Sequence, residues 1–220
     1  VWGQRHSTVD YKRPAEQLDW MLGQGVSVSM YMFHGGTNFW YMNGANTAGG
    51  YRPQPTSYDY DAPLGEWGNC YPKYYAFREV IQKHLPHGTV LPEVPADNPT
   101  TTFATIELKE SAPLQAAFHQ TTESENVLSM EDLGVDFGYI HYQTTINKAG
   151  KQKLIIQDLR DYAVILVDGK QVASLDRRYN QNNVMLDIQK APATLEILVE
   201  NTGRVNYGPD ILFNRKGITN

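Results

Sequence analysis

The sequence predicts an α/β region followed by an all-β region, and two changes of pattern along its 220 residues indicate this division. Up to about residue 85, apolar residues recur first at helical spacing and then as a continuous, strand-like run. After a proline-rich stretch, short alternating segments separated by turn residues take over. Alternating helix and strand favours a parallel α/β architecture, whereas several strands without helices favour a β-sandwich.

The first predicted helix of residues 1–85 lies between Pro14 and Gly25. Proline is favoured in the first turn of a helix, and glycine is favoured directly after its end. The apolar face of this helix is made of Leu18, Met21 and Leu22. Residues 26–33 then become almost continuously apolar, so we expect a strand that is buried on both faces.

A long loop rich in glycine and aromatic residues, 35–68, follows this strand and leads to a second predicted helix. We expect Asn69 to cap that helix and Pro72 to lie in its first turn. Its apolar face is formed by Tyr74, Phe77, Ile81 and Leu85.

Residues 86–101 are predicted to form an extended linker, because prolines punctuate a stretch without any period. Residues 102–220 are predicted to form a β-sandwich, which we expect further sequence to complete. The six expected strands are Thr102–Leu108, Gly138–Ile146, Lys153–Gln157, Ala163–Val167, Val184–Ile188 and Thr194–Glu200. Asp168-Gly169 predicts a tight hairpin, since Asp-Gly is favoured in two-residue turns.

The composition argues against several classes of function. With 41% hydrophobic residues, 20% charged residues and a net charge of −5, it is typical of a globular protein. Charges of both signs are interspersed and apolar runs are short, so we expect neither a nucleic-acid partner nor a membrane span. The single cysteine, Cys70, excludes an internal disulfide; a Cys-His nucleophile is one interpretation, and an inert thiol is the favoured one. Because the chain opens on Val1-Trp2-Gly3, we interpret it as a piece of a longer protein.

Aromatic and amide side chains are concentrated between residues 31 and 75, which hold nearly half of the chain's aromatic residues. Sugars present apolar C–H faces with a fringe of hydroxyls, so their sites combine aromatic plates with Asn, Asp, Gln and Tyr side chains. Loops that follow buried strands form the active-site face of a (β/α)₈ barrel. The composition therefore suggests a sugar site, but on composition alone packing of a long loop and its domain contacts is the favoured interpretation.

The order of three motifs resembles the glycoside hydrolase family 35 β-galactosidases. These motifs are Tyr31–Phe39 with Asn43–Asn46, Gln54–Leu64, and Asn201–Gly208. The opening Trp2-Gly3-Gln4 is similar to the stretch just after the nucleophile of that family, so the resemblance runs nearly end to end. It implies the C-terminal part of a (β/α)₈ TIM barrel, followed by a jelly-roll-like β-sandwich domain.

The resemblance also implies a retaining hydrolase that removes terminal, non-reducing β-D-galactose from glycosides or oligosaccharides. Such enzymes use two carboxyl groups about 5 Å apart, one as nucleophile and one as acid/base. Neither can be matched here: Glu16 and Glu79 fall on predicted helices, and Glu66 aligns with a family position that is not catalytic. We therefore assign no catalytic residue and expect the 220-residue chain to be inactive without the remaining N-terminal barrel segment, its expected partner. A non-catalytic carbohydrate-binding or interaction module is the alternative.

Tyr60 is the residue that the resemblance places in the wall of the galactose pocket, with a core tyrosine as the alternative interpretation. Tyr31, at the end of the predicted strand, and Tyr58 are further candidates for substrate binding. The residues expected to shape the loop are Asn38, Asp59 and Trp40. Trp40 and Trp67 add bulk where many relatives have a small residue, which leaves the preferred linkage or leaving group open.

His34 could be a base or a metal ligand, but it has no second histidine or carboxylate at ligand spacing. A structural role is therefore favoured, and neither a metal nor a cofactor is expected. In the β-region, we expect Arg204 to tie its turn to a neighbour, in a structural domain rather than an independent sugar-binding one. The resemblance and the absence of paired cysteines favour a periplasmic or secreted location, or a lysosomal one in a eukaryote.

Overall fold

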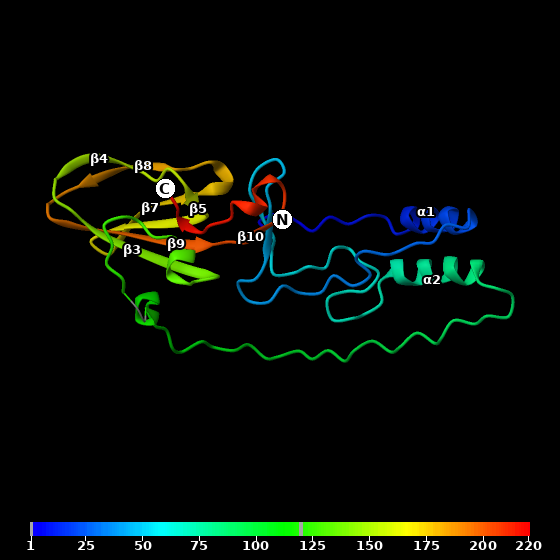
Figure 1. Ribbon diagram of the computed structural model, residues 1–220. Helices are drawn as coiled ribbons and strands as arrows, with labels where there is room; N and C mark the ends of the chain where they lie inside the picture. Colours follow the sequence, from blue (N-terminus) through cyan, green and yellow to red (C-terminus); the bar gives the residue numbers. More distant parts are fainter. Residues whose placement is uncertain (1, 119–120) are drawn as a thin grey trace. The chain divides into compact units, whose positions relative to one another are not determined.

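The computed structural model describes residues 2–118 and 121–220 and divides the chain into two compact units (Figure 1). The helical unit contains residues 3–38 and 55–113. The β-unit contains residues 39–54 and 114–220, together with Trp2. The segment 39–54 thus belongs with strands that follow much later in the chain, and not with the residues on either side of it.

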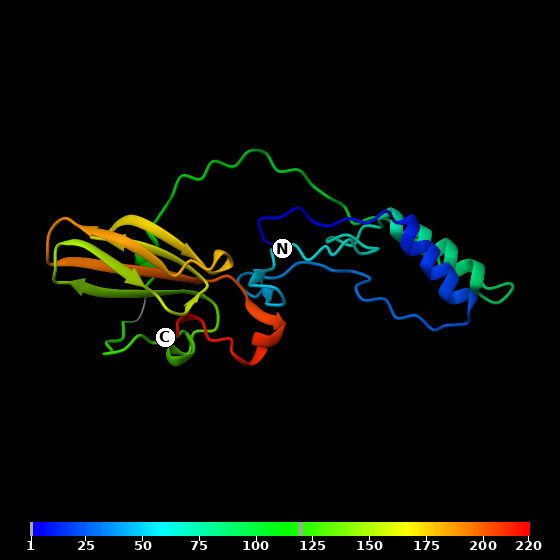
Figure 2. The same ribbon diagram turned by 90° about the horizontal axis from the view of Figure 1, so that it is seen from above.

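Two α-helices form the regular part of the helical unit, and they lie side by side in Figures 1 and 2. Helix α1 spans Lys12–Gly23 and helix α2 spans Pro72–His84, so both predicted helices are confirmed. Leu18 of α1 is buried, and Asp19 of α1 accepts a hydrogen bond from the Lys83 ammonium of α2 at 2.7 Å. None of the helices in the described part of the chain is long and apolar enough to cross a bilayer.

The end of α1 agrees with the prediction, whereas the start of α2 does not. Gly25 ends α1 as predicted: its φ of 73° is left-handed, and its N–H donates to the Leu22 carbonyl at 3.0 Å. The prediction that Asn69 caps α2 is wrong, because Tyr71 directly precedes the helix and no side chain caps it. Pro72, at the start of the helix, has no N–H that would need a cap.

Residues 26–33 were expected to form a buried strand, and this prediction is wrong, because they adopt no strand structure. A strand exists through hydrogen bonds to a neighbouring strand, and no strand among the described residues pairs with this segment. Its side chains are consequently accessible, with 48% of Val26 and 81% of Tyr31 exposed. The apolar run shows that the segment is suited to burial, but burial also requires a partner.

The β-unit is built on a four-stranded antiparallel sheet in the order β3-β9-β6-β7. Its strands are β3 (Gly138–Ile146), β6 (Tyr162–Val167), β7 (Lys170–Asp176) and β9 (Ala193–Asn201). A second, two-stranded sheet pairs β4 (Gly150–Ile155) with β8 (Asn183–Ile188). Side chains from both sheets share one buried core, including Ile165, Ile197 and Val199 from the first and Leu186 and Ile188 from the second.

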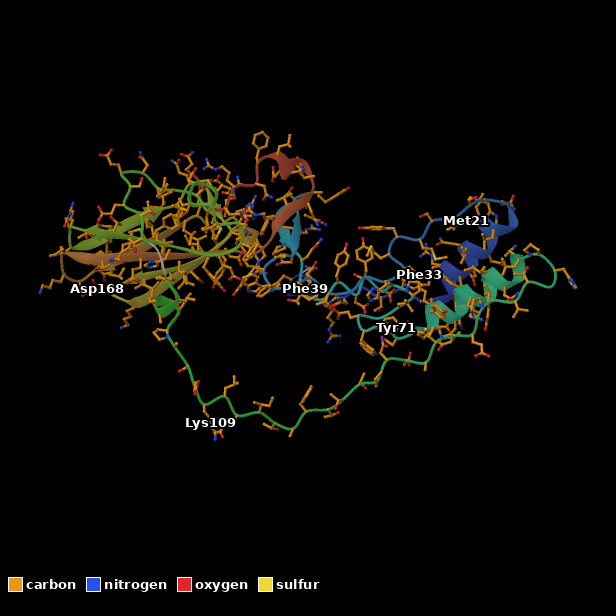
Figure 3. The ribbon with its side chains drawn as sticks, turned by 60° about the horizontal axis from the view of Figure 1, so that its bottom comes forward. Met21, Phe33, Phe39, Tyr71, Lys109 and Asp168 are labelled. Atoms are coloured by element: carbon orange, nitrogen blue, oxygen red, sulfur yellow. The ribbon has the colours of Figure 1, made fainter. Side chains whose placement is uncertain are left out.

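Five of the six predicted strands are confirmed, with shifts of a few residues at their ends. The Asp168-Gly169 hairpin is also confirmed: Val167 pairs with Lys170, and Figure 3 labels Asp168 in this turn. The sixth prediction, Thr102–Leu108, is wrong, since residues 85–113 contain no helix or strand. Leu108 is 89% exposed, and Lys109 lies on the same segment in Figure 3. Alternating residues alone do not make a strand without a partner to pair with.

Short elements complete the β-unit. Strands β1 (Gly44–Asn46), β2 (Arg52–Pro53) and β10 (Arg204–Tyr207) form a sheet in the order β10-β1-β2, in which β1 runs parallel to β10. Strand β5 (Leu159–Arg160) pairs with β11 (Gly217–Ile218). The 3₁₀ helices are η1 (Leu114–Ala117), η2 (Glu131–Leu133), η3 (Arg177–Tyr179) and η4 (Pro209–Leu212).

A buried ion pair lies in the interior of the β-unit. The Lys216 ammonium is 2.7 Å from the Asp161 carboxylate, and the two side chains are 0% and 1% exposed. The second Asp161 oxygen accepts a hydrogen bond from Arg177 at 2.9 Å. Burial lowers the pKa of Lys216 to about 8, although the charge of Asp161 opposes this shift, so the ammonium keeps its proton at neutral pH.

Candidate functional site

The three tyrosines predicted to bind substrate lie together in the helical unit. The rings of Tyr58 and Tyr60 are 5.2 Å apart between centroids. Burial, and then a hydrogen bond with the side chain of Tyr31, raise the pKa of Tyr58. Tyr31 and Tyr60 are largely accessible, at 81% and 57% exposure. We call Tyr31, Tyr58 and Tyr60 the tyrosine cluster; it presents aromatic faces and phenol hydroxyls at one surface.

Backbone hydrogen bonds join the two halves of the loop, residues 35–38 and 55–58, next to this cluster. The Tyr58 N–H donates to the Gly36 carbonyl at 2.9 Å, and the Asn38 N–H donates to the Thr56 carbonyl at 2.7 Å. The Asn38 side chain adds a hydrogen bond to the Pro55 carbonyl at 3.0 Å. Asn38 is therefore hydrogen-bonded to the second half of the loop through both its backbone and its side chain.

Gly35 lies against the backbone of Tyr58 and Asp59. A Cβ atom on this residue would be 1.8 Å from the Tyr58 carbonyl oxygen and 2.7 Å from that of Asp59. Both are backbone atoms, so neither can move aside as a flexible side chain could. Only glycine fits at this position, beside the backbone of a residue of the tyrosine cluster.

Glu66 connects three parts of the loop. One carboxylate oxygen accepts a hydrogen bond from the Thr37 hydroxyl at 2.8 Å, and the other accepts one from the Ser57 hydroxyl at 2.9 Å. Its backbone carbonyl lies 3.2 Å from Nε2 of His34. Both carboxylate oxygens are therefore engaged in holding the loop, and His34 takes part in the same structure.

The two acidic residues on either side of Tyr60 are also engaged. Asp59 accepts hydrogen bonds from the Asp61 N–H and from the Tyr71 hydroxyl, both at 3.0 Å. Asp61 accepts one from the Val9 N–H at 2.9 Å and pairs with the Lys73 ammonium at 2.8 Å. Lys73 also donates to the backbone carbonyl of Asp61.

The backbone between these two contacts is unusual. Tyr60 and Asp61 have φ angles of 60° and 50°, in the left-handed region that residues with a side chain rarely adopt. Such residues cost on the order of 1–3 kcal/mol each and are concentrated at functional sites. The hydroxyl of Tyr60 forms no hydrogen bond to any other described residue, so this part of the cluster is free to contact a ligand.

Sequence reasoning did not identify Tyr71, Lys73 or Gly35. The position of Lys73 contained a signal, since a cation in the first turn of a helix is disfavoured by the helix dipole unless it has an anionic partner. Burial, and then the Asp59 carboxylate, raise the pKa of Tyr71, so its phenol remains a donor to Asp59. Nothing in the local sequence points to Tyr71.

The two tryptophans with unassigned roles belong to different units. Trp40 belongs to the β-unit, where its ring centroid is 5.0 Å from that of Phe137. Trp67 belongs to the helical unit, is 51% exposed, and accepts a hydrogen bond from Asn98 at its carbonyl at 2.6 Å. The structure therefore does not group Trp40 with the tyrosine cluster in one unit.

The contacts of two other candidate residues, Cys70 and Arg204, indicate structural roles. Burial, and then the charge of Asp97, raise the pKa of the Cys70 thiol, which makes it a poor nucleophile. In the β-unit, Arg204 donates to the Asp136 carbonyl at 2.7 Å and to Glu131 at 2.6 Å, so it does tie its turn to neighbours. It also lines a pocket of about 270 Å³ with Tyr41, Met42, Asn43, Asp136 and Phe137.

Two family profiles match the chain in succession. Residues 1–84 match the family described as "Glycosyl hydrolases family 35", and residues 127–220 match "Beta-galactosidase, first all-beta domain". Proteins named beta-galactosidase from Xanthomonas manihotis, Mus musculus and Homo sapiens are 41%, 43% and 39% identical to it. These matches cover 99%, 94% and 94% of this chain, but the chain spans only 37%, 33% and 31% of the relatives.

A solved structure gives a weaker match. A β-galacturonidase of family 2 from Eisenbergiella tayi is 27% identical over 42% of this chain and 18% of its own. Its TM-score of 0.30 is too low to establish a common fold.

Proposed function

The chain belongs to glycosyl hydrolases family 35, and from this premise we propose that it forms one wall of the galactose pocket in a retaining β-galactosidase. The complete protein would hydrolyse terminal, non-reducing β-D-galactose from glycosides or oligosaccharides. The observation that carries this proposal is the tyrosine cluster, in which three phenols meet at an accessible surface. Aromatic rings cover the apolar face of a sugar, and phenol hydroxyls bind its oxygens.

The chain's own acidic residues support a binding role better than a catalytic one. Asp59, Asp61 and Glu66 are the carboxylates nearest to Tyr60 in the sequence, and each accepts hydrogen bonds that hold the loop. A retaining enzyme needs two facing carboxyl groups about 5 Å apart. We therefore propose that the nucleophile and the acid/base come from the rest of the protein, and that the chain prepared alone does not turn over galactosides.

The finer architecture is part of the same proposal. We place residues 1–85 in the C-terminal part of a (β/α)₈ TIM barrel. Residues 86–101 would form a linker, and residues 102–220 a jelly-roll-like domain. The expected location is periplasmic or secreted, or lysosomal in a eukaryote.

Hydrolysis of nitrophenyl glycosides by the complete protein tests this function. We expect turnover of the β-galactoside and little turnover of the β-glucoside. Proton NMR of the reaction should detect the β-anomer of galactose as the first product. Binding of galactose without hydrolysis by the complete protein would instead identify a non-catalytic carbohydrate-binding module. Release of the α-anomer first would contradict a retaining mechanism.

A further inference from the structure

We propose that Lys73 and Tyr71, at the start of α2, are positioning residues that fix the orientation of Tyr60. This inference rests on the proposed function, because Tyr60 matters for turnover only if the tyrosine cluster binds the sugar. Neither residue belongs to the tyrosine cluster itself. Both act on the residues that flank Tyr60, Lys73 on Asp61 and Tyr71 on Asp59.

The Lys73 contact is suited to hold a backbone conformation. Its ammonium lies 2.8 Å from the Asp61 carboxylate and also donates to the Asp61 backbone carbonyl. The two side chains are only 13% and 22% exposed, so solvent screens this pair less than a surface pair. By contacting the carbonyl and the carboxylate together, Lys73 restrains the residue that follows Tyr60 in its left-handed conformation.

Tyr71 restrains the other side of Tyr60. Its hydroxyl donates to one oxygen of Asp59 at 3.0 Å, while the other oxygen of Asp59 accepts the Asp61 N–H at 3.0 Å. Figure 3 labels Tyr71 where the chain enters α2. Tyr71 directly precedes α2 and Lys73 lies in its first turn, so both restraints come from the start of one helix. A helix is a more rigid support for a site than a loop.

The side chain of Tyr60 depends on these restraints because it has few of its own. It is 57% exposed, and its hydroxyl has no hydrogen-bond partner among the described residues. Its left-handed backbone and the neighbouring Tyr58 ring therefore set its direction. A displacement of about 1 Å at a substrate-positioning group can lower a rate by about 100-fold.

The test is a double-mutant cycle in the complete enzyme, with kcat/KM for nitrophenyl β-galactoside as the readout. We expect Lys73→Met to lower kcat/KM by about 10- to 100-fold and Tyr71→Phe to lower it less. In the Tyr60→Phe background, where the hydroxyl to be positioned is gone, both changes should have little further effect. A role limited to folding would lower kcat/KM by the same factor in both backgrounds, and that result would overturn the proposal.

Two further variants sharpen the cycle. Lys73→Arg keeps the cation and should recover part of the loss. Lys83→Met removes a 64%-exposed lysine from the last turn of the same helix, and we expect kcat/KM to stay unchanged. Tyr71→Phe removes only one hydroxyl, so it remains informative if Lys73→Met does not fold.

The cycle separates failure of this inference from failure of the proposed function. If Tyr60→Phe alone leaves kcat/KM unchanged, Tyr60 is not part of the sugar pocket, and the proposed function loses its main support. If Tyr60→Phe lowers kcat/KM while Lys73→Met and Tyr71→Phe do not, only the positioning role is wrong.

Discussion

The hydroxyl of Tyr51 lies 2.8 Å from a carboxylate oxygen of Asp161 and donates to it in the interior of the β-unit, across 110 positions of sequence. The Arg177 guanidinium lies 4.3 Å from the centroid of the same ring. Tyr51 comes from the segment 39–54, whose strand β1 also pairs with β10. Residues that the sequence places in a long loop therefore complete the polar interior of a β-domain that begins much later in the chain.

The first prediction concerns the stability of this arrangement. Tyr51→Phe removes the hydroxyl and leaves polar atoms of a buried cluster without a partner, which costs about 1–3 kcal/mol. Urea unfolding of the chain, monitored through a spectroscopic signal of the β-unit, measures this loss of unfolding free energy. Tyr207→Phe, at a 63%-exposed tyrosine of β10, is the matched control and should change the unfolding free energy little. Equal effects of the two changes would contradict the role of Tyr51.

A second prediction concerns the ion pair. Lys216→Met leaves the buried Asp161 carboxylate without its ammonium partner, so we expect a loss of about 3–5 kcal/mol. Removing both partners in Lys216→Met with Asp161→Leu should be less harmful than the sum of the single changes, because neither member of the pair is then left buried without the other. Additive losses in urea unfolding would show that the two groups do not act as a pair.

Gly35 is the subject of a third prediction. A methyl group at this position would collide with the backbone carbonyls of Tyr58 and Asp59, so Gly35→Ala should displace the tyrosine cluster and lower kcat/KM in the complete enzyme by about tenfold or more. Gly23→Ala is a suitable control, because a Cβ there meets only a His84 side-chain atom at an ordinary 3.6 Å. We expect that control to keep full activity. Full activity of Gly35→Ala would show that the loop can move aside.

The fourth prediction is a dependence of stability on pH. Although burial raises the pKa of Glu131, the Lys216 N–H and the Arg204 guanidinium outweigh it and lower the pKa below the usual 4.5. As the pH falls below about 4.5, the unfolded state binds a proton at Glu131 before the folded state does, so stability decreases. Above that pH the stabilisation is fully present.

Glu131→Gln should therefore flatten the loss of unfolding free energy between pH 5 and pH 3, whereas Glu125→Gln, at an exposed glutamate, should not. Urea unfolding across that pH range measures both slopes. An unchanged slope in Glu131→Gln would exclude this carboxylate as a source of the acid sensitivity.

The sequence was informative where structure depends on local pattern. Pro72 and Gly25 marked a start and an end of helices, and Asp168-Gly169 marked a hairpin, because each acts through its own backbone. Residues 26–33 and Thr102–Leu108 were misjudged, since a strand also needs a partner that an apolar pattern cannot reveal.

The candidate site divides in the same way. Order and composition pointed to Tyr31, Tyr58 and Tyr60, and the structure does bring these three side chains together. The contacts of Lys73 with Asp61 and of Tyr71 with Asp59 depend on how α2 packs beside the loop. The first-turn position of Lys73 indicates that it needs an anionic partner, but no local pattern identifies that partner as Asp61.

The most direct test of the proposed pocket is kcat/KM for nitrophenyl β-galactoside in the complete enzyme carrying Tyr60→Phe. Loss of one hydrogen-bond donor to a reacting sugar should lower kcat/KM by about 100-fold, with thermal stability unchanged because that hydroxyl bonds to no other described residue. An unchanged kcat/KM would contradict the assignment of Tyr60 to the galactose pocket.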